Sequence, residues 1–171
     1  MVYRTILIFP KFENMELLSL IRSKYDPIAS LIRPHITLVF PFQSALSDEM
    51  LVKLIEKQTA DFSPFDAHFA GITMQKDSFG NYLFLNVNQG KETLIELHDR
   101  LYDSELQPFA STAPYIPHIT LGKLDTCEAL FQAYEAVKDL PLSLETKIDT
   151  LSVEKIGPKG ESILILEKKL G

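Results

Sequence analysis

Hydrophobic and polar positions along the chain predict strands and helices in a repeating order. Runs rich in β-branched and aromatic residues, bounded by proline or glycine, predict strands, and apolar residues three or four positions apart predict helices. The predicted strands are 2–9, 35–40, 65–75, 82–87, 118–123, 142–156 and 162–170. The predicted helices are 13–25, 48–58, 91–106 and 127–140. Helices and strands therefore mix along the whole chain.

The order of elements in the first half returns in the second half. Each half has the order strand, helix, strand, helix, strand, and the central strand carries the pentapeptide PHITL at 34–38 and again at 117–121. A period of about 80 residues is too long for a solenoid repeat. We therefore expect one domain over 1–171, with two pseudo-symmetric lobes at approximately 1–80 and 81–171. Exchange of terminal strands between the lobes is left open.

The repeated pentapeptide places a histidine and a threonine on one face of each strand. Because alternate side chains of a strand share a face, His35 and Thr37 are expected to point one way and the isoleucine and leucine the other. His118 and Thr120 repeat this arrangement. If a two-fold axis relates the lobes, both pairs converge on one cleft. One imidazole could then take a proton from a nucleophile and the other protonate the leaving oxygen of a phosphodiester, while the hydroxyls bond its charged oxygens.

The repeated strand also permits two hypotheses that involve no catalysis. Threonine favours strands, so a duplication could have copied a strand that only packs well. The same four side chains could also hold a nucleotide phosphate without turnover, as a binding module. Two polar side chains on one face of a core strand carry a desolvation cost, and binding alone would not need both imidazoles. These considerations favour an enzyme over the two non-catalytic hypotheses.

Composition narrows the class of partner. The chain has 23 acidic and 17 basic residues, and its formal net charge is −6. This charge repels long nucleic acid, so we expect a small ligand or a nucleic-acid end rather than a long duplex. No apolar run approaches the roughly 20 residues of a membrane span, and the N-terminus lacks the basic start of a signal peptide. We expect a cytoplasmic protein without a membrane partner, and a monomer as the default.

The remaining reactive side chains are expected to be structural. His68 and His98 lack a threonine two residues later. Cys127 is the only cysteine, which excludes an intramolecular disulfide and a multi-cysteine metal cluster. No second ligand accompanies either motif histidine as in H-E-x-x-H, so no metal site is predicted.

The paired H-x-T-x motifs, one in each half of a duplicated chain, resemble those of the 2H phosphoesterase superfamily. That superfamily includes the bacterial 2′-5′ RNA ligase-like proteins and the 2′,3′-cyclic nucleotide phosphodiesterases. The resemblance covers essentially the whole chain, and KYDPIASLIRPHITLVFPF (24–42) further resembles the first motif of a small bacterial branch. It implies an α+β fold in which two antiparallel sheets line a central cleft and helices pack outside.

The resemblance also implies metal-independent hydrolysis or transfer at a 2′,3′-cyclic phosphate or a 2′-5′ phosphodiester, without a cofactor. His35 and His118 would be catalytic, and Thr37 and Thr120 would bind the phosphate. We assign His118 as general base and His35 as general acid, although the pseudo-symmetry permits the reverse and ligation would exchange the roles. The motifs do not distinguish among a cyclic nucleotide, an RNA end and related phosphoesters as substrate.

Three residues beside the motifs are further candidates for substrate binding. Lys123 follows the second motif, but strand alternation puts it on the face opposite His118 unless the strand bends near Gly122. Arg33 precedes the first motif and could reach the cleft mouth or lie on the surface. Tyr115 could stack on a base or pack at the rim.

Overall fold

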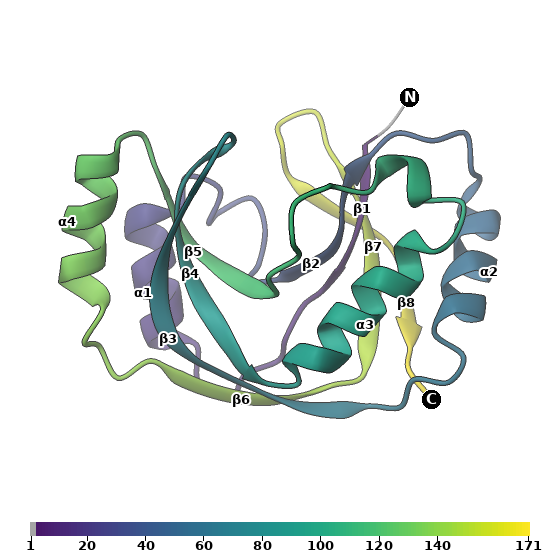
Figure 1. Ribbon diagram of the computed structural model, residues 1–171, viewed down its shortest axis with the longest axis horizontal. Helices are drawn as coiled ribbons and strands as arrows, with labels where there is room; N and C mark the ends of the chain where they lie inside the picture. The colour runs from purple at the N-terminus through teal and green to yellow at the C-terminus, as the bar shows by residue number, and fades with distance from the viewer. Residues whose placement is uncertain (1–2) are drawn as a thin grey trace.

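The computed structural model describes residues 3–171 and contains two four-stranded antiparallel sheets (Figure 1). The first sheet has the order β2 (Ile36–Phe42), β1 (Arg4–Ile8), β7 (Thr150–Ile156) and β8 (Ser162–Lys169). The second sheet has the order β5 (His118–Leu124), β4 (Gly80–Gln89), β3 (Phe65–Asp77) and β6 (Ser143–Ile148). The α+β class with two antiparallel sheets is confirmed.

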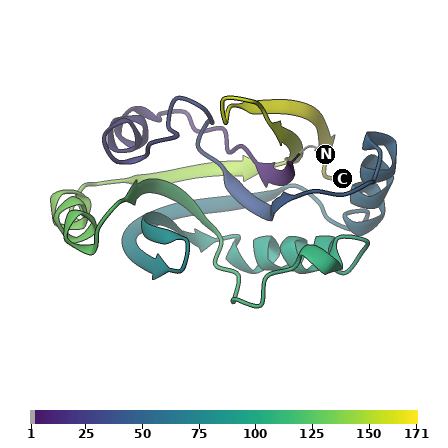
Figure 2. The same ribbon diagram turned by 90° about the horizontal axis from the view of Figure 1, so that it is seen from above.

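Helices cover the outer face of each sheet. Within the described residues they are α1 (Glu16–Tyr25), α2 (Asp48–Gln58), α3 (Lys91–Tyr102), α4 (Cys127–Val137) and the short 3₁₀ helix η1 (Gln107–Phe109). Figures 1 and 2 show α1 and α4 at the end of the molecule formed by the second sheet, and α2 and α3 at the other end. Side-chain caps fix two of the helix starts, because the hydroxyls of Ser47 and Thr126 accept backbone N–H groups of α2 and α4.

The sheets do not divide the chain at the expected lobe boundary near residue 80. β3 precedes this point but lies in the second sheet, while β7 and β8 follow it and lie in the first. The helices cross in the same way, because α1 packs on β5 and α3 packs on β2. Each sheet therefore depends on residues from both halves of the chain.

The single strand predicted at 142–156 is wrong, because the chain changes sheets within it. β6 ends and β7 begins on either side of Asp149. The carbonyl oxygen of Asp149 accepts the N–H of Leu170, and its carboxylate accepts the hydroxyl of Thr150. The stretch contains no proline or glycine, so its hydrophobic pattern carries no sign of the break.

Other predicted elements differ at their ends. The helices predicted at 91–106 and 127–140 end at Tyr102 and Val137. The predicted strand 2–9 begins at Arg4, and Val2 lies outside the described residues.

The strand of the first pentapeptide shifts its register directly after the threonine. Leu7 of β1 pairs with Thr37, but Ile6, one residue earlier in β1, pairs with Val39. Leu38 is therefore the extra residue of a β-bulge on the edge strand β2. A bulge shifts the alternation of side chains by one residue.

The second pentapeptide has the same irregularity. Phe84 of β4 pairs with Thr120, but Leu83 pairs with Gly122, so Leu121 is the extra residue on the edge strand β5. The internal duplication thus preserves both the pentapeptide and the bulge that follows its threonine.

The isoleucine and leucine of each pentapeptide enter the core, as alternation predicts. Both pairs are 0% exposed, whereas the histidines and threonines are half-buried. We call the side of each sheet that carries His35 and Thr37, or His118 and Thr120, the motif face.

Replacement of Gly122 by alanine is expected to destabilise the fold, because α1 packs directly on this residue. A methyl group there would lie 2.7 Å from Cβ of Tyr25 and 3.0 Å from its carbonyl oxygen. Overpacking of this kind costs about 1–3 kcal/mol, which lowers the melting temperature by roughly 2–12 °C in a chain of this length. Thermal unfolding followed by circular dichroism measures this. An unchanged melting temperature for Gly122→Ala would contradict the close packing of α1 on β5.

Candidate functional site

The two motif strands bring the predicted histidines together. β2 and β5 are edge strands of different sheets and contact each other, and they meet near the middle of the molecule in Figure 1. His118 is the first residue of β5, and His35 immediately precedes β2. Positive charge on His35 lowers the pKa of His118, so the two rings are near each other. Thr37 and Thr120 lie two residues further along the same motif faces.

Each histidine is oriented by the same backbone contact. Nδ1 of His35 lies 2.8 Å from the carbonyl oxygen of Arg33, and Nδ1 of His118 lies 2.6 Å from that of Ile116. Because a carbonyl oxygen only accepts hydrogen bonds, Nδ1 carries the hydrogen in both rings. Nε2 is therefore the nitrogen at which each ring can take up or release a proton.

The surroundings of the two histidines differ. Phe84 lies flat against the imidazole of His118, with 3.5 Å between ring centroids and an angle of 15° between the rings. The matching residue of the first sheet is Leu7, which pairs with Thr37 as Phe84 pairs with Thr120. His35 meets an aromatic ring only edge-on, at 6.3 Å from Phe9. The chemically equal histidines thus have unequal environments.

Burial lowers the pKa of both imidazoles. For His118, burial is the largest cause and lowers the pKa to about 4; the bond to the Ile116 carbonyl raises it, and nearby His35 lowers it further. For His35, burial again lowers the pKa from its usual 6.5, while the bond to the Arg33 carbonyl opposes this. Both rings are therefore mainly neutral at pH 7 without a ligand. A bound anion would favour protonation of one of them.

The bulge after Thr120 brings Lys123 to the motif face. Lys123 pairs with Tyr82, which is two residues before Phe84 and so shares its face. The ammonium nitrogen lies 5.4 Å from the centroid of the Tyr82 ring. Regular alternation would have placed Lys123 on the opposite face, and the irregularity beside Gly122 reverses this. The exposed cation of Lys123 lies on the same face as His118.

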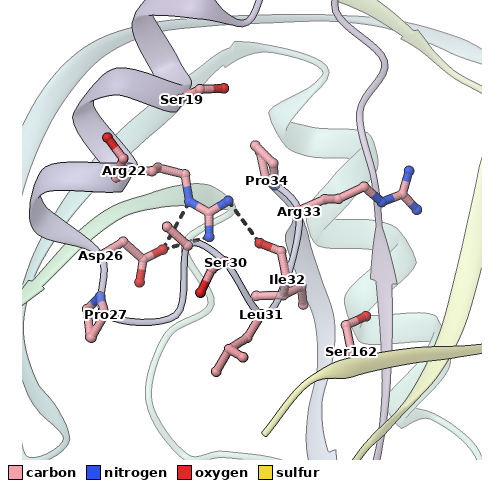
Figure 3. Close-up of a pocket in the computed structure, with 12 residues that line it drawn as sticks. Ser19, Arg22, Asp26, Pro27, Ser30, Leu31, Ile32, Arg33, Pro34 and Ser162 are labelled. Atoms are coloured by element: carbon pink, nitrogen blue, oxygen red, sulfur yellow. Dashed lines mark hydrogen bonds and ion pairs between the residues drawn. The ribbon is translucent and has the colours of Figure 1, made fainter.

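Arg33 lies beside the other histidine. Its guanidinium carbon is 4.1 Å from the centroid of Phe9, and Phe9 also contacts His35. Figure 3 shows the side chain of Arg33 extending away from Arg22 and Asp26. Each side of the site therefore has one cation, and each histidine contacts one aromatic ring.

Tyr115 has contacts that its sequence position did not predict. Its hydroxyl donates to the carbonyl oxygen of Thr37 at 2.7 Å. Its ring stacks on His98, with 3.8 Å between centroids and 3° between planes. One face of the ring is therefore closed to a base. His98, expected to be structural, in turn donates from Nδ1 to the carbonyl oxygen of Leu38 at 2.7 Å.

A buried ion pair fixes the segment that leads to His35. The guanidinium of Arg22 donates to the carboxylate of Asp26 at 2.7 and 3.0 Å and to the carbonyl oxygen of Ile32 at 3.0 Å (Figure 3). Arg22 and Asp26 are only 3% and 6% exposed. The segment from Asp26 to Pro34 borders an open cavity of about 730 Å³ between α1 and Ser162. The ion pair thus holds the lead-in to the first motif against α1.

Sequence reasoning missed several of these residues. The spacing of four between Arg22 and Asp26 on a helix was a usable signal, because such residues are neighbours on the helix surface. The stack of Phe84 on His118 and the bond from His98 to Leu38 carried no comparable signal, since each joins residues more than 30 positions apart in sequence.

Residues 3–171 contain neither a cluster suited to a metal ion nor a helix suited to a membrane. No three of the histidine, cysteine, aspartate and glutamate side chains described lie close enough together to hold a metal ion. None of the helices in this range has the length and apolar character required to span a membrane.

Residues 10–158 match the family model described as the 2′-5′ RNA ligase superfamily. The chain belongs to this superfamily. The match confirms the resemblance inferred from the two H-x-T-x motifs. Relatives in the 2′-5′ RNA ligase superfamily include a provisionally named phosphoesterase of Geobacillus sp. (strain WCH70), 31% identical over 124 residues that cover 69% of this chain and 67% of the relative. A similarly named protein of Bacillus licheniformis is 26% identical over 125 residues, 69% of each chain.

Solved structures with the fold of the 2′-5′ RNA ligase superfamily match almost the whole chain. LigT of Escherichia coli, complexed with 3′-AMP, has a TM-score of 0.64 at 17% identity and covers 99% of this chain and 98% of its own. TT0787 of Thermus thermophilus has a TM-score of 0.64 at 17% identity, covering 98% and 97%. At this identity the likeness shows the shared fold.

Removal of one partner of the buried ion pair is expected to destabilise the chain strongly. Asp26→Ala leaves Arg22 buried without its counter-charge, which costs about 3–5 kcal/mol and lowers the melting temperature by roughly 6–20 °C. The matched control is Asp61→Ala, which breaks the exposed pair with Arg100 and should change the melting temperature little, because solvent screens such a pair. Equal melting temperatures for the two variants would show that the buried pair does not hold the segment.

Replacement of Phe84 by leucine, the residue at the matching position of the first sheet, is expected to raise the pKa of His118. The stacked ring keeps water from one face of the imidazole, so its loss makes the charged form less costly. Imidazole NMR signals followed against pH should titrate near 4 for His118 in the wild type and closer to 6.5 in Phe84→Leu.

The control for this titration is Phe9→Leu, which should leave His118 unchanged because Phe9 contacts the other histidine. A wild-type His118 that titrates near 6.5, or a Phe84→Leu variant without a shift, would contradict the role of the stack.

Proposed function

We propose that this chain is a phosphoesterase that acts on a 2′,3′-cyclic phosphate or a 2′-5′ phosphodiester of a nucleotide or an RNA end. The observation that carries the proposal is the matched orientation of the two histidines. Each donates from Nδ1 to a backbone carbonyl, and Nε2 is left for proton exchange. General acid–base catalysis at a phosphodiester needs two such groups on opposite sides of the phosphate.

Family membership supports this proposal at the level of reaction class. The nature of the ligand is supported by the shared fold, because LigT has been solved with 3′-AMP, with ATP and with NADP+. Cations on both sides of the site, Lys123 on the motif face of the second sheet and Arg33 over the ring of Phe9, fit an anionic ligand. They would attract it locally although the net charge of the chain is −6.

In hydrolysis of a cyclic phosphate, His118 acts as general base. Its Nε2 accepts a proton from water as the water oxygen bonds to phosphorus. The bond from phosphorus to one ribose oxygen breaks, and His35 donates the proton on its Nε2 to that oxygen. Thr37 and Thr120 donate hydrogen bonds to the non-bridging oxygens, where negative charge must be stabilised. The product is a nucleoside phosphomonoester, and proton exchange with solvent restores both imidazoles.

The inequality of the two environments supports this division of roles. Phe84 shields His118, and the pKa of about 4 keeps this ring neutral, as a base must be. His35 lacks such a stack and meets the ring of Phe9 only edge-on. We therefore assign the role of general acid to His35. Because the base must be neutral, the rate should fall as the pH falls through about 4, where His118 becomes protonated.

The proposal predicts that each histidine is needed for turnover. We expect His35→Ala and His118→Ala each to lower the hydrolysis rate of 2′,3′-cyclic nucleotides roughly 10²–10⁴-fold, measured at pH 5–6 with EDTA present. His68→Ala is the matched control, because His68 bonds to Ser143 on the strand pair β3–β6, away from the motif strands, and should retain wild-type activity.

Equal melting temperatures would exclude unfolding as the cause of the lost activity. A wild-type protein that binds the cyclic nucleotides but hydrolyses neither these nor 2′-5′ linked dinucleotides would contradict the proposed enzymatic function. The chain would then be a binding module. Loss of activity with EDTA alone would overturn the two-histidine mechanism.

A further inference from the structure

Side chains contact the backbone of the first motif strand at four consecutive residues, 37–40. The contacts are Tyr115 hydroxyl to Thr37 oxygen at 2.7 Å, His98 Nδ1 to Leu38 oxygen at 2.7 Å, Thr5 hydroxyl to Val39 oxygen at 2.6 Å, and Phe40 nitrogen to Tyr102 hydroxyl at 3.1 Å. Three of these four side chains come from α3 or from the segment before β5.

The bulge explains why these contacts are needed. β2 is an edge strand, so its outer side has no neighbouring strand, and the extra residue Leu38 interrupts its pairing with β1 on the inner side. A buried backbone N–H or C=O without a partner costs free energy comparable to a lost hydrogen bond. The side chains supply the partners that the sheet does not.

Tyr115 connects the two motifs. It lies three residues before His118, yet its hydroxyl bonds to the backbone of Thr37, in the other sheet. Burial raises the pKa of this hydroxyl, so it stays protonated and remains a donor. The segment that enters the second motif is thereby tied to the threonine of the first.

His98 supports Tyr115 and the bulge at the same time. Its ring stacks on that of Tyr115 with the two planes nearly parallel, while its Nδ1 donates to the carbonyl oxygen of Leu38. The ring of Tyr102 packs edge-on against the imidazole of His98, with 4.9 Å between ring centroids. Motion of Tyr115 relative to the bulge would therefore break two contacts of one imidazole.

We propose that Tyr115, held by His98, is a positioning residue that sets the place of Thr37 relative to the second motif. This inference rests on the proposed phosphoesterase function and adds a residue that does not touch the reacting atoms. Thr37 must reach the same phosphate as Thr120 on the other sheet. A displacement of about 1 Å at such a group can cost on the order of 10²-fold in rate.

The first test removes only the hydroxyl of Tyr115. We expect Tyr115→Phe to lower kcat roughly 10–100-fold with KM changed less, because the ring stays stacked and Thr37 remains present but misplaced. Tyr134→Phe on α4 is the same chemical change on the outer side of the second sheet and should keep wild-type kcat. A kcat for Tyr115→Phe equal to that of Tyr134→Phe would overturn the inference.

A double-mutant cycle separates positioning from general destabilisation. If Tyr115 acts through Thr37, then Tyr115→Phe should change kcat little in a Thr37→Ala background. Full additivity of the two losses would overturn the inference. His98→Asn keeps an amide donor for the Leu38 carbonyl, so it should retain more activity than His98→Ala, measured well below both melting temperatures.

The experiment also distinguishes failure of this inference from failure of the proposed function. If the wild type hydrolyses no nucleotide tested, the function fails, and calorimetric binding of 3′-AMP becomes the readout. Weaker binding by Tyr115→Phe than by Tyr134→Phe would then support the positioning role. Equal binding by both variants, or no binding by the wild type, would overturn it.

Discussion

Each pentapeptide strand lies at the edge of its sheet and contains one extra residue directly after the threonine. This register shift is the constraint on which the rest of the site depends. Before it, alternation sends His and Thr to the motif face and Ile to the core; after it, the faces change, and Lys123 joins His118. The shift also leaves backbone groups of β2 without strand partners, which is why α3 and Tyr115 contact them. The same irregularity thus determines which side chains face the site, including the cation of Lys123, and which contacts support the strand.

The duplication preserves the reacting groups and changes their surroundings. Phe84 occupies on one sheet the position that Leu7 occupies on the other. Two imidazoles in identical surroundings would have the same proton affinity, so neither would be favoured as the general acid or as the general base. A ring stacked on only one of them makes their environments unequal. Acid–base catalysis requires such a difference between groups of the same chemical type.

Much of this arrangement could be predicted from the sequence, because it depends on local alternation. The two faces of PHITL and the pairing of His35 with His118 follow from the repeat. The bulges could not be predicted, since PHITL continues into a regular strand pattern and its register is set by β1 and β4. The change of sheet at Asp149 was equally hidden. Phe84 and the stack on Tyr115 depend on contacts distant in sequence, and only the spacing of Arg22 and Asp26 carried an overlooked local signal.

The interleaving of the sheets has a consequence for synthesis on the ribosome. β1 is a central strand whose neighbour β7 lies nearly 150 residues later in the chain. Until β7 leaves the ribosome, one edge of β1 lacks its partner, and the first sheet cannot close. Pairings so distant in sequence slow folding, because the entropy of a long loop is lost before contacts form. The nascent chain would therefore carry both histidines well before it has a site, and activity would begin only after β7 has been made.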